Sequence, residues 1–198
     1  MTEIQDFLKS VGLKIEENGK VRAAEISKEL SMLEDYILLF QKGKTYYIYE
    51  VHRSDRILEK QEQEKSRAVI WAVILYKRMN DNIADRTTAR EIRRLMGEDE
   101  ERAVQKMFCK FDDKNFSIGK EQENCLCLMK NEGGTDVLYN GITIIAGASL
   151  ARAYVTLYNY CQILQEIKSF YNVHRELMEK NEITEQEVAE VYMGVKRD

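Results

Sequence analysis

The sequence predicts an α+β protein in which short antiparallel strands, joined as hairpins, pack against two long apolar helices. Three observations lead to this fold class. Aromatic and β-branched residues dominate two groups of short segments, which is typical of strands. Turn-forming residues separate these segments, and each group precedes a long apolar stretch. The strands are predicted at 36–40 and 45–51 before a helix over about 61–80, and at 125–129, 136–139 and 142–145 before a helix over 149–171.

The first half begins with a predicted short helix over 2–9, because Ile4, Phe7 and Leu8 recur at helical spacing. A hairpin follows over 13–24, and its Asn18-Gly19 pair favours a type I′ turn. A brief helix is predicted over 27–33. The segment 52–56 reads as a polar connection from strand to helix. The long helix is apolar on every side from 68 to 76, which predicts that it is buried as the central core element.

The second half adds further short helices. Thr87 or Thr88 is the predicted cap of a helix through Met96 that Gly97 closes, and Glu91 suits a capping box with Thr88. The acidic run 98–101 is predicted to begin another helix, which carries Val104 to Phe111. A turn over 112–115 and a strand over 116–119 follow. After the second long helix, helical structure is predicted to continue to about 180, and a last helix to begin at 184 and end at 194.

We predict a single domain over residues 1–198, because no linker rich in Pro, Gly or Ser divides the chain, which contains no proline. The polar stretch 80–87 is the one candidate boundary, and it defines two halves, 1–82 and 83–198, as candidate pseudo-repeats. Their shared order of strands and helix fits a duplication. It also fits convergent packing, because a helix buries a sheet face efficiently.

Composition predicts a cytoplasmic protein with no membrane segment. The N-terminus lacks the basic and apolar regions of a signal peptide, and the longest apolar run falls well short of the roughly 20 residues that span a bilayer. The four cysteines then read as reduced thiols. A net charge of −4 gives no broad basic field, so nucleic acid is not favoured as a partner. Arg86, Arg90, Arg93 and Arg94 form the one candidate basic patch.

No catalytic or metal-binding signature is evident, so we predict no catalytic residue, no metal and no cofactor. The spacing of Cys109, Cys125, Cys127 and Cys161 provides no paired zinc ligands, which favours buried thiols that act as small hydrophobic residues. The glycines at 133–134 and 147 match no phosphate-binding loop. The second histidine, His174, lies in a charged helical stretch typical of a solvated surface.

The candidate site is a protein-binding surface around the first hairpin. Tyr47 and Tyr49 share one face of a strand, and tyrosine is enriched at interface hot spots. His52 ends that strand within a polar corner, and acidic residues flank the hairpin in a way that favours a basic partner. The candidate residues are Glu34, Asp35, Tyr47, Tyr49, Glu50, His52, Arg53, Asp55 and Arg56.

An aromatic hairpin, a polar corner and a long apolar helix resemble the small α+β immunity proteins of bacterial polymorphic-toxin systems. The residues that carry the resemblance are 36–43, 46–56 and 68–76, less than a quarter of the chain. The resemblance implies stoichiometric binding of a cognate toxin domain, without catalysis or a cofactor. A basic nuclease toxin is the partner that the acidic residues favour.

Two functions of other classes stay open. The helix pair over 87–110 loosely resembles a helix-turn-helix, and Arg90, Arg93 and Arg94 lie within it. This pattern favours a phage or mobile-element regulator that binds nucleic acid, although the run 98–101 opposes it. A small enzyme centred on His52 is the other alternative.

Overall fold

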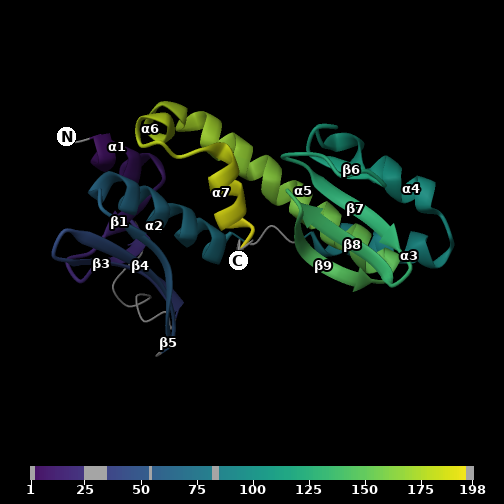
Figure 1. Ribbon diagram of the computed structural model, residues 1–198, viewed down its shortest axis with the longest axis horizontal. Helices are drawn as coiled ribbons and strands as arrows, with labels where there is room; N and C mark the ends of the chain where they lie inside the picture. Colours follow the sequence, from purple (N-terminus) through teal and green to yellow (C-terminus); the bar gives the residue numbers. More distant parts are fainter. Residues whose placement is uncertain (1–2, 25–34, 54, 82–84, 195–198) are drawn as a thin grey trace. The chain divides into compact units, whose positions relative to one another are not determined.

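The chain is an α+β protein whose contacts divide it into two compact units (Figure 1). The computed structural model describes residues 3–24, 35–53, 55–81 and 85–194. The first unit comprises Met1–Asp81 and His174–Thr184, and the second comprises Asn82–Val173 and Glu185–Asp198. The division after Asp81 falls next to the predicted boundary of the halves, but residues 174–184 belong to the first unit. That the chain is a single domain stays a prediction.

The first unit is a five-stranded antiparallel sheet with helix α2 across one face. Its strands follow one another in the order β1-β2-β3-β4-β5. Their bounds are β1 Leu13–Ile15, β2 Lys20–Ala23, β3 Asp35–Lys42, β4 Thr45–His52 and β5 Asp55–Glu62, and the helices are α1 Glu3–Ser10, α2 Lys65–Asn80 and α6 Arg175–Lys180. The predicted first helix, first hairpin and two aromatic strands are confirmed. The helix predicted over 27–33 lies outside the described residues.

Strand β5 is the main correction to the first half. Its charged sequence, rich in Glu, Lys and Gln, favours a helix, and we predicted a polar connection followed by a helix from about 61. Instead, residues 55–62 pair with β4, and α2 begins at Lys65. The backbone hydrogen bonds of this pairing override the local preference. The corner at 52–56 is therefore a tight hairpin in which His52 lies opposite Asp55, and Arg53 adopts a φ of 54°.

The turn between β1 and β2 is not the predicted type I′ turn. Only Gly19 of the Asn18-Gly19 pair has a positive φ, at 84°. The Asn18 side chain instead accepts a hydrogen bond from the Lys20 backbone N–H at 3.0 Å. A Cβ atom on residue 19 would lie 2.2 Å from the carbonyl oxygen of Leu39. This turn therefore requires glycine both for its backbone conformation and for its close approach to β3.

Helix α2 forms the core of the first unit, as its apolar composition predicts. Every residue from Ala68 to Leu75 is buried, because α2 contacts β2, β3, β4 and β5 and α1 also packs against it. Trp71 is fully buried, and the Lys60 ammonium lies 4.2 Å from the centre of its ring. Arg67 donates to the carbonyl oxygens of Asn181 and Glu182, which fixes the segment after α6 on this unit.

His174 makes the stability of the first unit sensitive to mild acid. Its ring packs edge-on against Phe7 at 5.0 Å between ring centres. Burial, together with the charge of Lys77, lowers the pKa of His174 below its ordinary value of 6.5. His174 therefore binds a proton more readily in the unfolded chain than in the folded chain. The free energy of unfolding then falls as pH drops below about 6.5. His174→Phe should make the decline in unfolding midpoint between pH 7 and pH 5.5 shallower than in the wild type.

Urea titrations at several pH values measure this difference. The two proteins have the same carboxylates, so the contribution of these groups to the pH dependence cancels in the comparison. Equal slopes for the two proteins would show that His174 does not contribute to the pH dependence.

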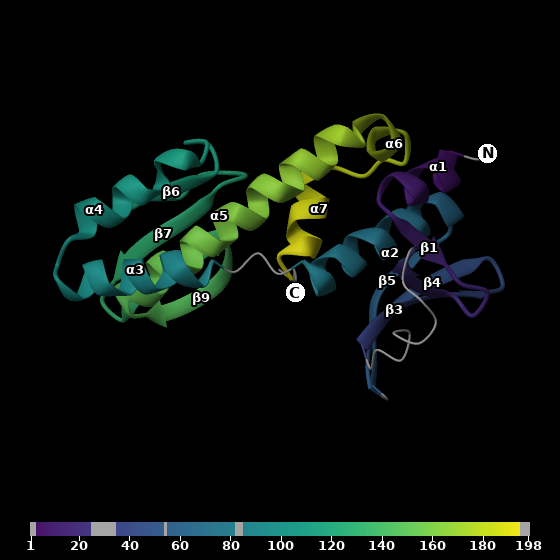
Figure 2. The same ribbon diagram turned by 180° about the vertical axis from the view of Figure 1, so that it is seen from behind.

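The second unit packs the long helix α5 against a four-stranded sheet of order β6-β7-β8-β9 (Figure 2). Helices α3 and α7 also contact α5. The elements are α3 Arg86–Gly97, α4 Glu101–Lys106, the 3₁₀ helix η2 Met107–Lys110, β6 Phe116–Ile118, β7 Leu126–Asn131, β8 Gly134–Tyr139, β9 Ile142–Ala148, α5 Leu150–Val173 and α7 Glu185–Tyr192. Strand β6 pairs with β7 in parallel, and the other pairs are antiparallel.

Helix ends differ from prediction at three places in the second half. Asp85, and neither Thr87 nor Thr88, caps α3, because its carboxylate accepts from the Thr88 backbone N–H at 3.0 Å. The predicted second helix is α4 followed by the 3₁₀ turn η2, in which Phe108 is buried. Helical structure does not continue unbroken to 180, because α5 ends at Val173 and α6 begins at Arg175.

The two units share a plan of sheet followed by long helix but differ in topology. The first sheet is wholly antiparallel, whereas the second contains the parallel β6–β7 pair. An aromatic cluster fills the second core, with Phe108 against Phe111, Phe116, Tyr154 and Tyr158. Whether the plan reflects a duplication stays open.

Candidate functional site

The predicted site residues lie on two opposite faces of the first sheet. Partners that face each other across antiparallel strands share a side. Ile37 and Ile48 are fully buried and point toward α2. Glu50 pairs with Ile37, and His52 pairs with both Asp35 and Asp55. Strand alternation therefore places Asp35, Glu50, His52 and Asp55 on the helix-covered side. Tyr47, Tyr49 and Arg56 lie on the other side. Arg53 lies in the β4–β5 turn, and Glu34 lies outside the described residues.

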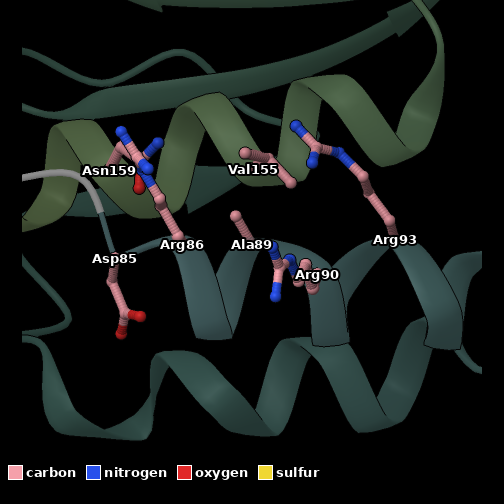
Figure 3. Close-up of a pocket in the computed structure, with 7 residues that line it drawn as sticks. All are labelled: Asp85, Arg86, Ala89, Arg90, Arg93, Val155 and Asn159. Carbon is pink, nitrogen blue, oxygen red and sulfur yellow. The ribbon is translucent and has the colours of Figure 1, made fainter.

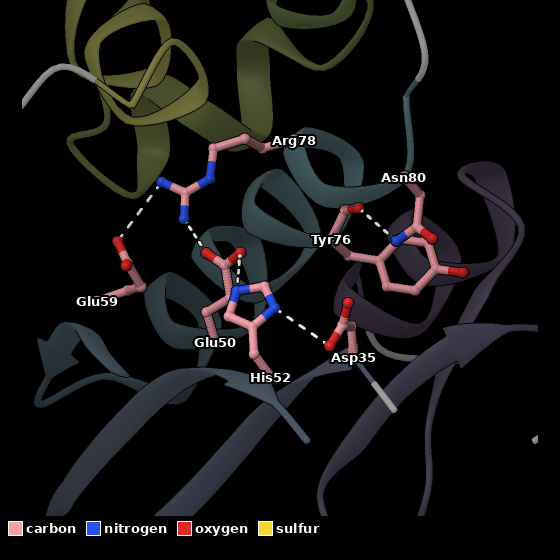
Figure 4. A network of polar contacts seen from close by, with 7 residues as sticks. All are labelled: Asp35, Glu50, His52, Glu59, Tyr76, Arg78 and Asn80. Atoms are coloured by element: carbon pink, nitrogen blue, oxygen red, sulfur yellow. Dashed lines mark hydrogen bonds and ion pairs between the residues drawn. The ribbon is translucent and has the colours of Figure 1, made fainter. Parts of the chain in front are cut away.

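A polar network on the helix-covered side joins three of the predicted residues to α2 (Figure 4). The imidazole of His52 lies between two carboxylates, with Nε2 2.9 Å from Glu50 and Nδ1 3.2 Å from Asp35. The second oxygen of Glu50 accepts from the Arg78 guanidinium, which also lies 3.5 Å from Glu59. The network therefore ties the ends of β3 and β4 to the last turn of α2.

Arg78 and Glu59 were not predicted as members of this site. Arg78 lies 28 positions after Glu50, and Glu59 lies just before the predicted helix, in a segment that is in fact β5. The one available signal was the basic character of the last turn of α2, which contains Lys77 and Arg78 and suits a helix C-terminus. The same helix end is closed by Asn80, whose side chain donates to the Tyr76 carbonyl oxygen at 2.8 Å (Figure 4).

The geometry around His52 suits a structural role better than catalysis. Both ring nitrogens already lie within hydrogen-bond distance of carboxylates of this chain. A general base needs a nitrogen within hydrogen-bond reach of the proton that it removes. Glu50 is 12% exposed at its side chain and is held by Arg78, so it is not an acid displayed to a partner either.

The opposite side of the sheet displays an aromatic face made of Phe40, Tyr47, Tyr49 and Leu58. In register, Phe40 lies beside Tyr47, and Leu58 lies beside Tyr49. The two tyrosine rings are stacked, with centres 6.4 Å apart and planes inclined by 18°. Phe40 on β3 is 49% exposed and Leu58 on β5 is 42% exposed, on the two strands that flank β4. These four residues form a partly exposed aromatic and aliphatic surface over β3, β4 and β5.

The charges that accompany the aromatic face are basic. Lys42 and Arg56 lie on the same side of the sheet by register, and both are exposed. Asp35 and Glu50, which favoured a basic partner, lie on the other side and belong to the polar network. The structure therefore does not bring the predicted acidic residues and tyrosines onto one surface.

The cysteines are mostly core residues. Cys125, Cys127 and Cys161 are buried, and Cys109 is exposed. Burial, aided by the neighbouring Cys127, raises the pKa of the Cys125 thiol to about 12, and burial also raises the pKa of Cys161. Such thiols are poor nucleophiles at neutral pH. The described part of the chain contains no group of three or more His, Cys, Asp or Glu side chains arranged to hold a metal ion.

A groove lined by arginines lies between α3 and α5 in the second unit (Figure 3). Its volume is about 310 Å³, and its lining residues are Asp85, Arg86, Ala89, Arg90, Arg93, Val155 and Asn159. Arg94, the fourth arginine of the predicted basic patch, is not in the groove. It instead binds Glu91 at 2.7 Å and Glu98 at 2.8 Å, and these hydrogen bonds raise its pKa above the ordinary value.

A larger hollow in the first unit is mainly aliphatic. It has a volume of about 1080 Å³ and lies between α1, β1 and the start of α2. Ile4, Leu8, Leu13, Leu39 and Val69 supply most of its apolar lining. Charged residues such as Glu16 and Lys65 also line it.

Comparison with protein-family models, with curated proteins and with solved structures finds no match to the chain. Among the described helices, none combines the length and apolar character needed to cross a bilayer.

Proposed function

We propose that this protein acts by binding another protein through the aromatic face, and that the partner is a cognate toxin domain which it neutralises. The observation that carries the proposal is the exposure of Phe40 and Leu58 beside two stacked tyrosines on a rigid sheet. The resemblance of residues 36–79 to immunity proteins supports the choice of partner.

The physical chemistry of the face suits a binding hot spot. Tyrosine offers a large contact area with few rotatable bonds, so little entropy is lost when it is held in an interface. Tyr47 and Tyr49 lie on β4, which pairs with β3 on one side and β5 on the other, so their backbone is held in place before a partner binds. A stable interface needs about 800 Å² from each partner, so the four residues form the centre of a wider contact.

The proposed interface does not require Asp35 or Glu50. Glu50 is held by Arg78 and His52, so reversing its charge would first disrupt the fold. Lys42 and Arg56 beside the aromatic face instead favour an acidic rim on the partner, because complementary charges guide association.

Removing both tyrosine rings should abolish neutralisation. We expect cells that express the toxin encoded beside this gene to grow when the wild-type protein is present, and to stop growing with the Tyr47→Ala, Tyr49→Ala double variant. Loss of a central hot spot weakens binding by about 2 kcal/mol or more, roughly 30-fold. Growth rate against toxin dose measures the effect.

Tyr46→Ala is the matched control, because Tyr46 is on the same strand but on the side that α2 covers. Far-UV circular dichroism confirms that each variant is folded. Full protection by the folded double variant would rule out the aromatic face, and absence of protection by the wild type would rule out the toxin as partner.

A further inference from the structure

A row of three arginines follows one face of α3. Arg86, Arg90 and Arg93 are spaced at i, i+4 and i+7, which places them on the same side of a helix. With a rise of 1.5 Å per residue, their backbone positions span about 10.5 Å along the helix axis. Figure 3 shows the Arg86 and Arg93 side chains extending from α3 toward α5 on either side of Val155.

These three positive charges are unfavourable for α3 itself. Like charges four residues apart destabilise a helix, and Arg86 begins α3, where a positive charge opposes the helix dipole. Within the described part of the chain, none of the three arginines forms an ion pair. By contrast, Arg94 on the same helix has two acidic partners.

The carboxylate in the groove lining is held by another residue. Asp85 accepts hydrogen bonds from the Thr88 backbone at 3.0 Å and from the Thr88 hydroxyl at 2.5 Å, and these hydrogen bonds lower its pKa. Figure 3 shows its side chain directed away from α5. Asp85 therefore serves as the helix cap and leaves the guanidinium groups available to a ligand.

The wall that α5 contributes adds an apolar surface and one unsatisfied polar atom. Val155 faces Ala89 across the groove, and both are buried. The Oδ1 atom of Asn159 is buried and has no hydrogen-bond partner in the described structure. An unsatisfied buried oxygen is unfavourable, and a ligand that donates a hydrogen bond would satisfy it.

We propose that this groove binds a small molecule that carries two or more phosphate groups. Guanidinium groups match phosphate oxygens in paired hydrogen bonds. A ligand with two or more phosphate groups can contact all three arginines at once along this length of α3. The volume of about 310 Å³ is at the lower end for small-molecule sites. The net charge of −4 disfavours nucleic acid, which needs a broad basic surface.

Titration calorimetry with sodium tripolyphosphate and with ADP tests the proposal on the full chain. We expect the wild type to bind both, and the Arg86→Gln, Arg93→Gln double variant to bind each at least tenfold more weakly. Asn159→Ala should weaken ADP binding more than tripolyphosphate binding, because only ADP has a base with donor groups for Oδ1. Equal effects on the two ligands would instead place the base outside the groove and confine the site to the polyphosphate.

Arg94→Gln is the matched control, because it removes the same charge from the same helix without altering the groove lining. It should leave both affinities unchanged. No binding by the wild type would overturn the proposal, as would an equal loss on Arg94→Gln, which would indicate nonspecific charge attraction. Tighter binding of a single-stranded oligonucleotide than of tripolyphosphate, with a steep salt dependence, would overturn it in favour of a nucleic-acid surface.

Discussion

Replacing Trp71 with alanine is expected to lower the free energy of unfolding by about 3 to 5 kcal/mol, the range found when a buried large aromatic residue is truncated. Trp71 is 0% exposed in the middle of α2, and the residues on both sides of it are also buried. The lost ring leaves a cavity that the surrounding strands cannot fill without moving, because protein interiors are closely packed. Urea unfolding followed by far-UV circular dichroism measures the change.

Trp71→Phe is the matched variant and should be destabilised far less. It keeps an aromatic ring beneath Lys60, and it removes an indole N–H that is buried without a hydrogen-bond partner among the described residues. A loss of less than about 1 kcal/mol in the alanine variant would be too small for a core aromatic residue, and would show that Trp71 is not a core residue.

Replacing Glu50 with alanine is expected to lower the free energy of unfolding by about 3 kcal/mol, the lower end of the range for breaking a buried ion pair. The substitution removes the carboxylate that accepts a hydrogen bond from the Arg78 guanidinium, and it removes one of the two carboxylates that hold His52. Trp71 is the only tryptophan of the chain. Its fluorescence therefore reports the unfolding of the first unit alone.

A double substitution distinguishes the effect of removing Glu50 alone from the effect of removing both Glu50 and Arg78. Glu50→Met combined with Arg78→Met should recover most of the stability that Glu50→Ala loses, because it removes both charges of the pair and fills similar volume. Additive losses in the corresponding double-mutant cycle would show that the two residues do not interact.

The parts of the fold that were predictable depend on patterns within one segment. The run from Ala68 to Leu75 is apolar on every side, so its burial followed from periodicity alone. The aromatic strands around Tyr47 followed from composition in the same way. Strand β5 did not, because residues 55–62 have a helical composition and become a strand only through pairing with β4. The Asp85 cap was missed because threonines also suit that role.

The sequence predicted many residues of the candidate site, but it did not predict that they lie on two opposite sides of the sheet. The alternation of a strand already places Tyr47 and Tyr49 opposite Glu50 and His52. These residues are close in sequence, so the prediction treated them as one surface. The side of the sheet that α2 covers is known only from how α2 packs in the structure. The contact between Glu50 and Arg78 joins residues far apart in sequence, so no local pattern indicates it.

Titration calorimetry of the purified toxin domain against this protein tests most directly whether the aromatic face is the binding surface. We expect one-to-one binding, at least 30-fold weaker for Tyr49→Ala, as expected at a hot spot, and unchanged for Tyr46→Ala. Glu50→Gln should bind as the wild type does once its lower stability is taken into account. Wild-type affinity in folded Tyr47→Ala and Tyr49→Ala variants, with binding lost in Glu50→Gln, would contradict this assignment and place the contact on the polar network instead.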